Sequence, residues 1–159
     1  MIEQNWSAFD GTNLYAVIWK PVAAPKAVMA FVHGHGTHCR RYDEWFGDFL
    51  AAGLAVISFD LRGHGRSGGN QGTIHRYSEY LEDTALLVRK ARENFPNIPL
   101  VLYGSSDRVS APEASENLAK GMHGNVTYRV WSDAPHQLHV WDRNDRVTAY
   151  TIDWINKLL

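Results

Sequence analysis

The sequence lacks the features that mark exported, membrane-spanning or nucleic-acid-binding proteins. Cys39 is its only cysteine, so no disulfide can form within the chain, which suits a reducing compartment. No apolar run approaches the roughly 20 residues of a membrane span, and residues 1–6 lack the basic and apolar regions of a signal peptide. The net charge is -1, which predicts no attraction to nucleic acid or anionic membrane. We therefore expect a cytoplasmic protein.

What is present is an alternation of strands and helices over 159 residues, which predicts one domain spanning residues 1–159. Residues 27–32 and 54–59 are continuous apolar runs, typical of central strands covered on both faces. Residues 6–9 and 14–19 flank a turn sequence and predict an antiparallel hairpin.

Helical periodicity separates the later strands. The clearest amphipathic stripe comprises Tyr77, Tyr80, Leu81, Thr84, Leu87, Val88, Ala91 and Phe95. Another stripe near the C-terminus comprises Val147, Thr151, Trp154, Ile155 and Leu158. The expected helices are 42–52, 77–95, 112–120 and 146–159, and the expected later strands are 100–103 and 126–131. This order predicts a three-layer α/β fold, with a mostly parallel sheet and helices on both faces.

In such a fold, ligands bind beyond the carboxyl ends of the strands. Four loops occupy these positions: the segments that follow Val32, Phe59, Tyr103 and Trp131. They carry His33-Gly-His-Gly-Thr-His38, Asp60-Leu-Arg-Gly-His-Gly-Arg-Ser67, Gly104-Ser-Ser-Asp107-Arg-Val and Ala134-Pro-His136-Gln-Leu-His139.

These four ordered motifs resemble the α/β-hydrolases, specifically the monoacylglycerol lipase and lysophospholipase branch. The resemblance implies hydrolysis of carboxylic esters through an acyl-enzyme, acting on an acyl-ester or lipid-like substrate, without metal or organic cofactor. It implies that the loop with Gly34 and His35 contributes a backbone N–H, at position 35, to an oxyanion hole. It also implies His136 as the general base and Asp107 as the acid that orients it. Asp107 and His136 should then lie on neighbouring strand ends.

The sequence departs from this family after Gly104. Members carry a nucleophile elbow, Gly-x-Ser-x-Gly, then a helix, a lid and a further strand before the Gly-x-x-Asp motif. Here the nucleophile strand runs directly into the acid loop, which implies a lidless domain reduced to about six strands. A natural in-frame deletion and a deliberate minimisation both remain open.

The departure leaves Ser106 at the nucleophile position, but Arg108 stands where the elbow requires a second small residue. Ser106 and Asp107 are also adjacent, so their side chains should diverge. We therefore expect hydrolysis to be weak or absent, with Ser106 capping the loop. Ser67 is a weaker candidate nucleophile, because its loop is structural in the family.

Two other functions remain open. The His33, His35 and His38 spacing is similar to a zinc motif, and Cys39 adds a soft ligand, which would fit a metal-binding hydrolase. Alternatively, loss of the lid would expose apolar surface and give a non-catalytic scaffold that associates as a homodimer or a domain-swapped oligomer.

Overall fold

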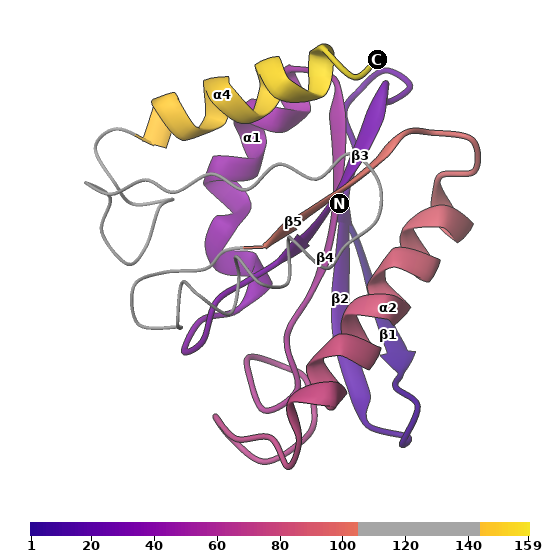
Figure 1. Ribbon diagram of the computed structural model, residues 1–159, viewed down its shortest axis with the longest axis vertical. Coiled ribbons are helices and arrows are strands. Elements are labelled where there is room, and N and C mark those ends of the chain that lie inside the picture. The colour runs from indigo at the N-terminus through magenta and orange to yellow at the C-terminus, as the bar shows by residue number, and fades with distance from the viewer. Residues whose placement is uncertain (105–143) are drawn as a thin grey trace.

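The computed structural model describes residues 1–104 and 144–159, and within them five strands form one sheet in the order β1-β2-β4-β3-β5 (Figure 1). The strands are β1 (Ile2–Ser7), β2 (Asn13–Trp19), β3 (Ala27–Val32), β4 (Leu54–Phe59) and β5 (Leu100–Gly104). The three adjacent strands β4, β3 and β5 are parallel, whereas β2 is antiparallel to both of its neighbours. The predicted α/β class is confirmed. The strand expected at 126–131 and the helix expected at 112–120 lie outside the described residues.

The predicted hairpin is present, and its first strand is longer than expected. β1 begins at Ile2, which pairs with Ile18, rather than at Trp6. The turn between the strands is closed by a hydrogen bond from the Thr12 N–H to Asp10 Oδ1 at 3.0 Å. Gly11 there has a φ of +83°, a conformation that glycine adopts without steric cost. A local side-chain contact and one glycine therefore fix the position of this turn.

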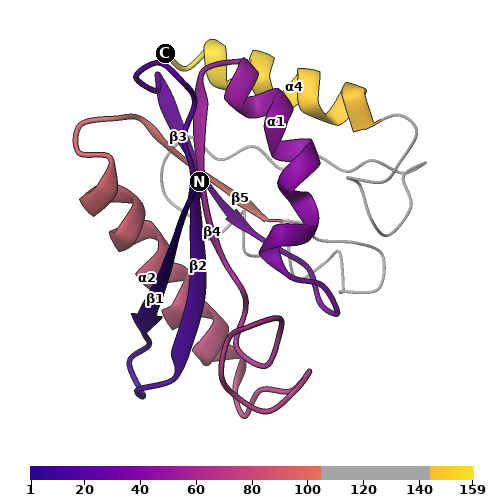
Figure 2. The same cartoon turned by 180° about the vertical axis from the view of Figure 1, so that it is seen from behind.

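Helices cover both faces of the sheet (Figures 1 and 2). One face carries α1 (Asp43–Ala51) and α4 (Asn144–Asn156), and the other carries α2 (Tyr77–Asn94). Every residue of β4 is buried, as its continuous apolar sequence predicts. The sheet is thus the middle of three layers, with one apolar core on each side.

Helix α1 follows the sequence prediction closely. Trp45, Phe46 and Phe49 are buried against the sheet, and Phe31 of β3 contacts the rings of the first two. The helix is stopped by Gly53, which has a φ of +80° and donates its N–H to the Leu50 carbonyl. The preceding 3-10 turn, η1 (Cys39–Tyr42), connects this helix to the loop after β3.

The stripe predicted for α2 is wrong at its N-terminal end. Tyr77 is 64% exposed and Leu81 is 45% exposed, whereas the charged residues Glu79 and Asp83 are buried. The cause is Arg62, whose buried guanidinium forms ion pairs with both carboxylates. The C-terminal half obeys the prediction, with Leu87 and Ala91 fully buried among its members. At the start of the helix, the ion pairs with Arg62 therefore bury two charged residues that the apolar stripe does not include.

The C-terminal helix ends three residues earlier than expected, at Asn156 and not at residue 159. Val147, Thr151 and Ile155 are buried as predicted. Leu158 lies beyond the helix end at Asn156 and is 47% exposed, so its assignment to the buried stripe was wrong. None of the helices in the described part of the chain has the length and apolarity needed to cross a membrane.

The carboxyl ends of the three parallel strands lie side by side. Val32 at the end of β3 pairs with Phe59 of β4 on one side and with Gly104 of β5 on the other. The loops that begin at His33 and Asp60 therefore start from adjacent points on one edge of the sheet. This confirms the predicted location of the loops after Val32 and Phe59. Of the loop after Tyr103 the structure describes only Gly104, and the loop after Trp131 lies outside the described residues.

Candidate active site

His33 is a buried link between the loops after β3 and β4. Its Nδ1 donates to the Gly34 carbonyl at 2.7 Å, and its Nε2 accepts the Leu61 N–H at 2.9 Å. The Leu61 bond requires an unprotonated Nε2, so the ring is the neutral Nδ1–H tautomer. Burial lowers the pKa of His33 to about 4, which keeps this tautomer at neutral pH. His33 therefore holds the two loops together as a neutral group.

The same contact orients the peptide bond of the expected oxyanion donor. A trans peptide directs its C=O and N–H to opposite sides, and the described residues contain no cis peptide bond. Because the Gly34 carbonyl points to the His33 ring, the His35 N–H on the same peptide points away from it. Gly36, with a φ of +73°, then turns the chain. The assignment of Gly34 and His35 to an oxyanion hole stays a prediction, and this geometry leaves the N–H available for it.

Asp60 is a second link between these loops, and sequence reasoning assigned it no role. Its carboxylate is buried, with Oδ1 accepting the Cys39 N–H at 2.7 Å and Oδ2 accepting the Arg66 N–H at 2.8 Å. Gly65 lies directly against it, since a Cβ added there would be 2.0 Å from Asp60 Oδ2. Gly65 also has a φ of +51°, so two constraints select glycine. The short spacing between Asp60 and the glycine-rich stretch in the sequence could have indicated this contact.

Arg62 anchors the loop after β4 to α2 and to the β1–β2 turn. Its Nε and Nη2 bind the two oxygens of Asp83 at 2.7 and 2.8 Å, and its Nη1 binds Asp10 Oδ2 at 2.8 Å. The hydrogen bond from Arg62 lowers the pKa of Asp10 to about 2. The fork-shaped guanidinium thus fixes three segments at one point, which a lysine could not do.

Ser67 is structural, as predicted. Its Oγ donates to the Asp60 carbonyl and accepts the Tyr15 N–H at 2.9 Å. Both contacts are to backbone, and together they attach the loop to β2. This hydroxyl is therefore engaged and does not serve as a nucleophile.

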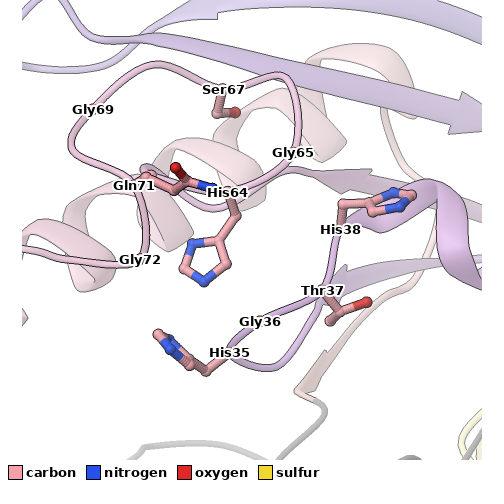
Figure 3. A pocket seen from close by; sticks show the side chains of 11 residues that line it. His35, Gly36, Thr37, His38, His64, Gly65, Ser67, Gly69, Gln71 and Gly72 are labelled. Atoms are coloured by element: carbon pink, nitrogen blue, oxygen red, sulfur yellow. The ribbon is translucent and has the colours of Figure 1, made fainter.

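The two loops enclose a cleft of about 480 Å³ (Figure 3). Its walls are five glycines and six polar side chains: His35, Thr37, His38, His64, Ser67 and Gln71. His64 is buried, and its Nδ1 contacts the Arg62 carbonyl at 3.0 Å. Its ring meets the exposed ring of His35 at a centroid distance of 5.0 Å and an angle of 81°. Sequence reasoning did not single out His64, although its position between two glycines of the loop was visible.

The structure does not support the alternative metal site at His33, His35 and His38. Both ring nitrogens of His33 are already used in hydrogen bonds. The side chains of His35 and His38 point in different directions (Figure 3). The Cys39 thiol is buried, and burial raises its pKa, which opposes the thiolate form that binds metals. Across residues 1–104 and 144–159, no group of three or more potential ligands is arranged to hold a metal ion.

The remaining predicted site residues, Ser106, Asp107 and His136, lie outside the described residues. Their predicted roles as nucleophile, acid and base stay predictions. What the structure does place is Gly104, the last described residue before them, beside Val32 at the start of the His33 loop. The point at which the sequence departs from the family therefore adjoins the expected oxyanion loop.

Comparison with known proteins gives a family match and several monoacylglycerol lipase relatives. The family described as serine aminopeptidase, S33, matches residues 23–106, which is more than half of the chain. Monoacylglycerol lipase of Mycolicibacterium smegmatis is 36% identical over 104 residues, which cover 65% of this chain and 37% of that protein. Monoglyceride lipase of Homo sapiens is 32% identical over 97 residues, which cover 61% of this chain and 32% of that protein. The chain spans about a third of the length of these curated relatives.

Solved structures agree with this result. A thermostable carboxyl esterase from Bacillus coagulans, in complex with glycerol, superposes with a TM-score of 0.58 at 31% identity, covering 65% of this chain and 35% of that chain. A soluble variant of monoglyceride lipase from Saccharomyces cerevisiae superposes with a TM-score of 0.61 at 20% identity. That alignment covers 76% of this chain and 40% of the yeast chain, and at this identity it supports the fold alone. On the matched residues, the shared sheet and these relatives, the chain belongs to the serine aminopeptidase S33 family of α/β-hydrolases, in its monoacylglycerol lipase branch.

Proposed function

We propose that this chain is a shortened carboxylic-ester hydrolase of the monoacylglycerol lipase type, with lipid-like acyl esters as its substrate class and with weak or absent hydrolysis. The substrate class rests on relatives whose names are monoacylglycerol lipase and monoglyceride lipase. The chain is a single domain without a lid in this proposal, and it needs no metal and no organic cofactor.

The chemistry of the complete site would be acyl transfer to a serine. A serine Oγ attacks the ester carbonyl carbon while His136 takes its proton, and the tetrahedral oxyanion accepts hydrogen bonds from backbone N–H groups. The C–O bond to the alcohol then breaks, and His136 returns the proton to the leaving oxygen. Water then takes the place of the alcohol and attacks the acyl carbon while His136 removes its proton. The bond to the serine Oγ breaks, and His136 returns the proton to the serine. Asp107 would orient His136 and stabilise its charged form.

The described loops support half of this machinery. The Gly34 carbonyl is held by His33 at 2.7 Å, which leaves the His35 N–H directed to the other side of the peptide. Asp60 accepts the Cys39 N–H from the loop that carries this donor, and Arg62 binds the loop of Asp60 to α2. The donor therefore lies on anchored backbone. In this proposal, the His35 N–H is a preorganised oxyanion donor.

The other half depends on a nucleophile elbow that the sequence lacks. The second oxyanion donor in this family follows the nucleophile on the elbow, and Arg108 replaces the small residue that the turn requires. The single observation that carries the proposal is the place where the family match ends, residue 106, two residues after Gly104 of β5. The match covers the expected oxyanion loop and stops within the altered sequence motif.

A comparison of variants tests this proposal. We expect the hydrolysis of a nitrophenyl butyrate ester to be slow and to change by less than about twofold in Ser106→Ala, because weak turnover arises from imidazole groups alone. His136→Ala is the parallel variant, and His75→Ala, an exposed histidine outside the cleft, is the control. A loss of about a hundredfold or more in both Ser106→Ala and His136→Ala, with His75→Ala unchanged, would show a working compressed triad and would contradict the proposal.

A further inference from the structure

Helix α2 has an apolar strip that the core beneath it does not cover. Tyr77 is 64% exposed and Leu81 is 45% exposed, and Val88 is half-buried about two turns further along. Together with Thr84, these residues are spaced four, three and four apart, so they lie on one face of the helix. In the part of the chain that the structure describes, α2 is the only helix on its face of the sheet (Figures 1 and 2). The strip therefore has no helical partner among the described elements.

Two exposed charges of opposite sign lie beside this strip. Glu82 and Arg89 are seven residues apart, and among the described residues neither forms an ion pair. Lys90, by contrast, binds Glu93 within the helix at 2.7 Å. Seven residues rise about 10 Å along the axis, so Glu82 and Arg89 are not neighbours on their own helix. Each charge is therefore open to a partner from outside the helix.

The strip is complementary to itself when two copies of α2 run antiparallel. Placing Leu81 of one copy opposite Val88 of the other also places Thr84 opposite Ala85, because both pairs are centred on the same point of the helix. Ala85 is exposed and small, so the two helices can approach closely at this centre. A two-fold axis repeats every contact, so each Leu81 is covered by a Val88.

The same register also pairs the polar side chains. Tyr77 lies opposite Arg92, whose guanidinium can stack on the ring. Glu82 lies two residues, or about 3 Å along the axis, from the position opposite Arg89, and both side chains are long enough to meet. Two copies aligned in parallel would instead bring Glu82 beside Glu82 and Arg89 beside Arg89, which is repulsive. Charge therefore selects the antiparallel direction.

We propose that α2 is a dimerisation surface, with this strip packed antiparallel against the same strip of a second copy of the chain. No element is exchanged between the copies, so the arrangement differs from a domain swap. One helix face from each copy falls at the small end of specific interfaces, and we expect a dimer with a Kd on the order of 10 μM. The surface uses none of the expected catalytic residues, so dimerisation does not depend on ester hydrolysis.

Sedimentation velocity of the full chain, between about 1 and 300 μM, tests the proposal. We expect the weight-average sedimentation coefficient to rise with concentration from the value of a monomer to that of a dimer. A coefficient that stays at the monomer value over this range would overturn the proposal. That is the result expected if another segment of the same chain covers the strip.

A substitution in the strip locates the interface. Leu81→Lys should raise the Kd about tenfold or more, because it places a charge in the central apolar contact. Leu81 is exposed in the single copy, so this variant should keep the circular dichroism of the unaltered chain. A folded variant that dimerises as tightly as the unaltered chain would show that the strip is not the interface.

Exchange of the two charges tests the register. Glu82→Arg and Arg89→Glu should each weaken the dimer about fivefold or more, because each brings like charges together at two contacts. An equimolar mixture of the two variants should associate within about twofold of the unaltered chain, since opposite charges then meet at both contacts. Glu44→Arg, at an exposed position of α1 on the other face of the sheet, is the matched control and should leave the Kd unchanged. A dimer that tolerates both single variants, or a mixture no tighter than either variant alone, would overturn the proposal.

Discussion

Replacing His33 with glutamine should change how the stability of this protein depends on pH. The folded chain protonates His33 only near pH 4, because burial opposes the charge, whereas the unfolded chain protonates it near pH 6.5. As the pH falls below 6.5, the unfolded state therefore gains protons that the folded state does not. Integrated from pH 7.5 to pH 5, this linkage removes about 2 kcal/mol from the free energy of unfolding.

His33→Gln provides the comparison because it does not titrate and can keep an acceptor for the Leu61 N–H. At pH 7.5 the variant should be less stable by about 1 kcal/mol, the usual net contribution of a lost hydrogen bond, here the one to the Gly34 carbonyl. Between pH 7.5 and pH 5 the difference should move by about 2 kcal/mol in favour of the variant, so the stability curves should cross. Urea unfolding at several pH values measures this directly. The other seven histidines are common to both proteins. A stability difference that is constant to within about 0.5 kcal/mol over this range would refute the buried neutral role of His33.

Two further predictions concern the loop after β4. Gly65→Ala should destabilise the fold by more than about 2 kcal/mol, since its Cβ would collide with Asp60 and its φ is positive, and thermal unfolding measures the loss. Gly47→Ala, inside α1, is the control, because a Cβ added there would meet nothing within 4 Å. This variant should stabilise the fold by up to about 1 kcal/mol. An equal loss of stability in both variants would count against the collision. Arg62→Lys should cost about 2 to 4 kcal/mol, because lysine keeps the charge but loses the two-point contact with buried Asp83. A cost below about 0.5 kcal/mol in chemical denaturation would mean that the geometry of this ion pair does not matter.

The sheet could be predicted because its sequence signals are local. The apolar runs of β3 and β4 reflect burial on both faces, and the turn before β2 has its own side-chain contact and glycine. The start of α2 could not be predicted in this way. Its orientation depends on Arg62, which lies 21 residues before Asp83 in the sequence, and hydrophobic periodicity carries no information about such a pair.

The candidate site, like the fold, has features that the sequence predicts and features that it does not. The position of the His33 and Asp60 loops follows from strand ends, which the sequence predicts. Whether an individual side-chain atom is already hydrogen-bonded does not follow from the strand ends. Whether His33 can bind a metal depends on its bond to Leu61, and whether Ser67 is free depends on Tyr15, 52 residues away in the chain. The same histidine or serine is therefore compatible with several roles, and only its hydrogen-bond partners in the folded chain distinguish between them.

In the proposed function, this chain keeps the expected oxyanion loop but lacks a working nucleophile. Reaction with a fluorophosphonate, followed by intact-mass measurement and peptide mapping, shows whether any serine in the chain is an activated nucleophile. The reagent phosphonylates a serine only when a base and an oxyanion site act on it together. We expect no stoichiometric adduct after prolonged incubation. One equivalent of label at Ser106, abolished in His136→Ala, would contradict it.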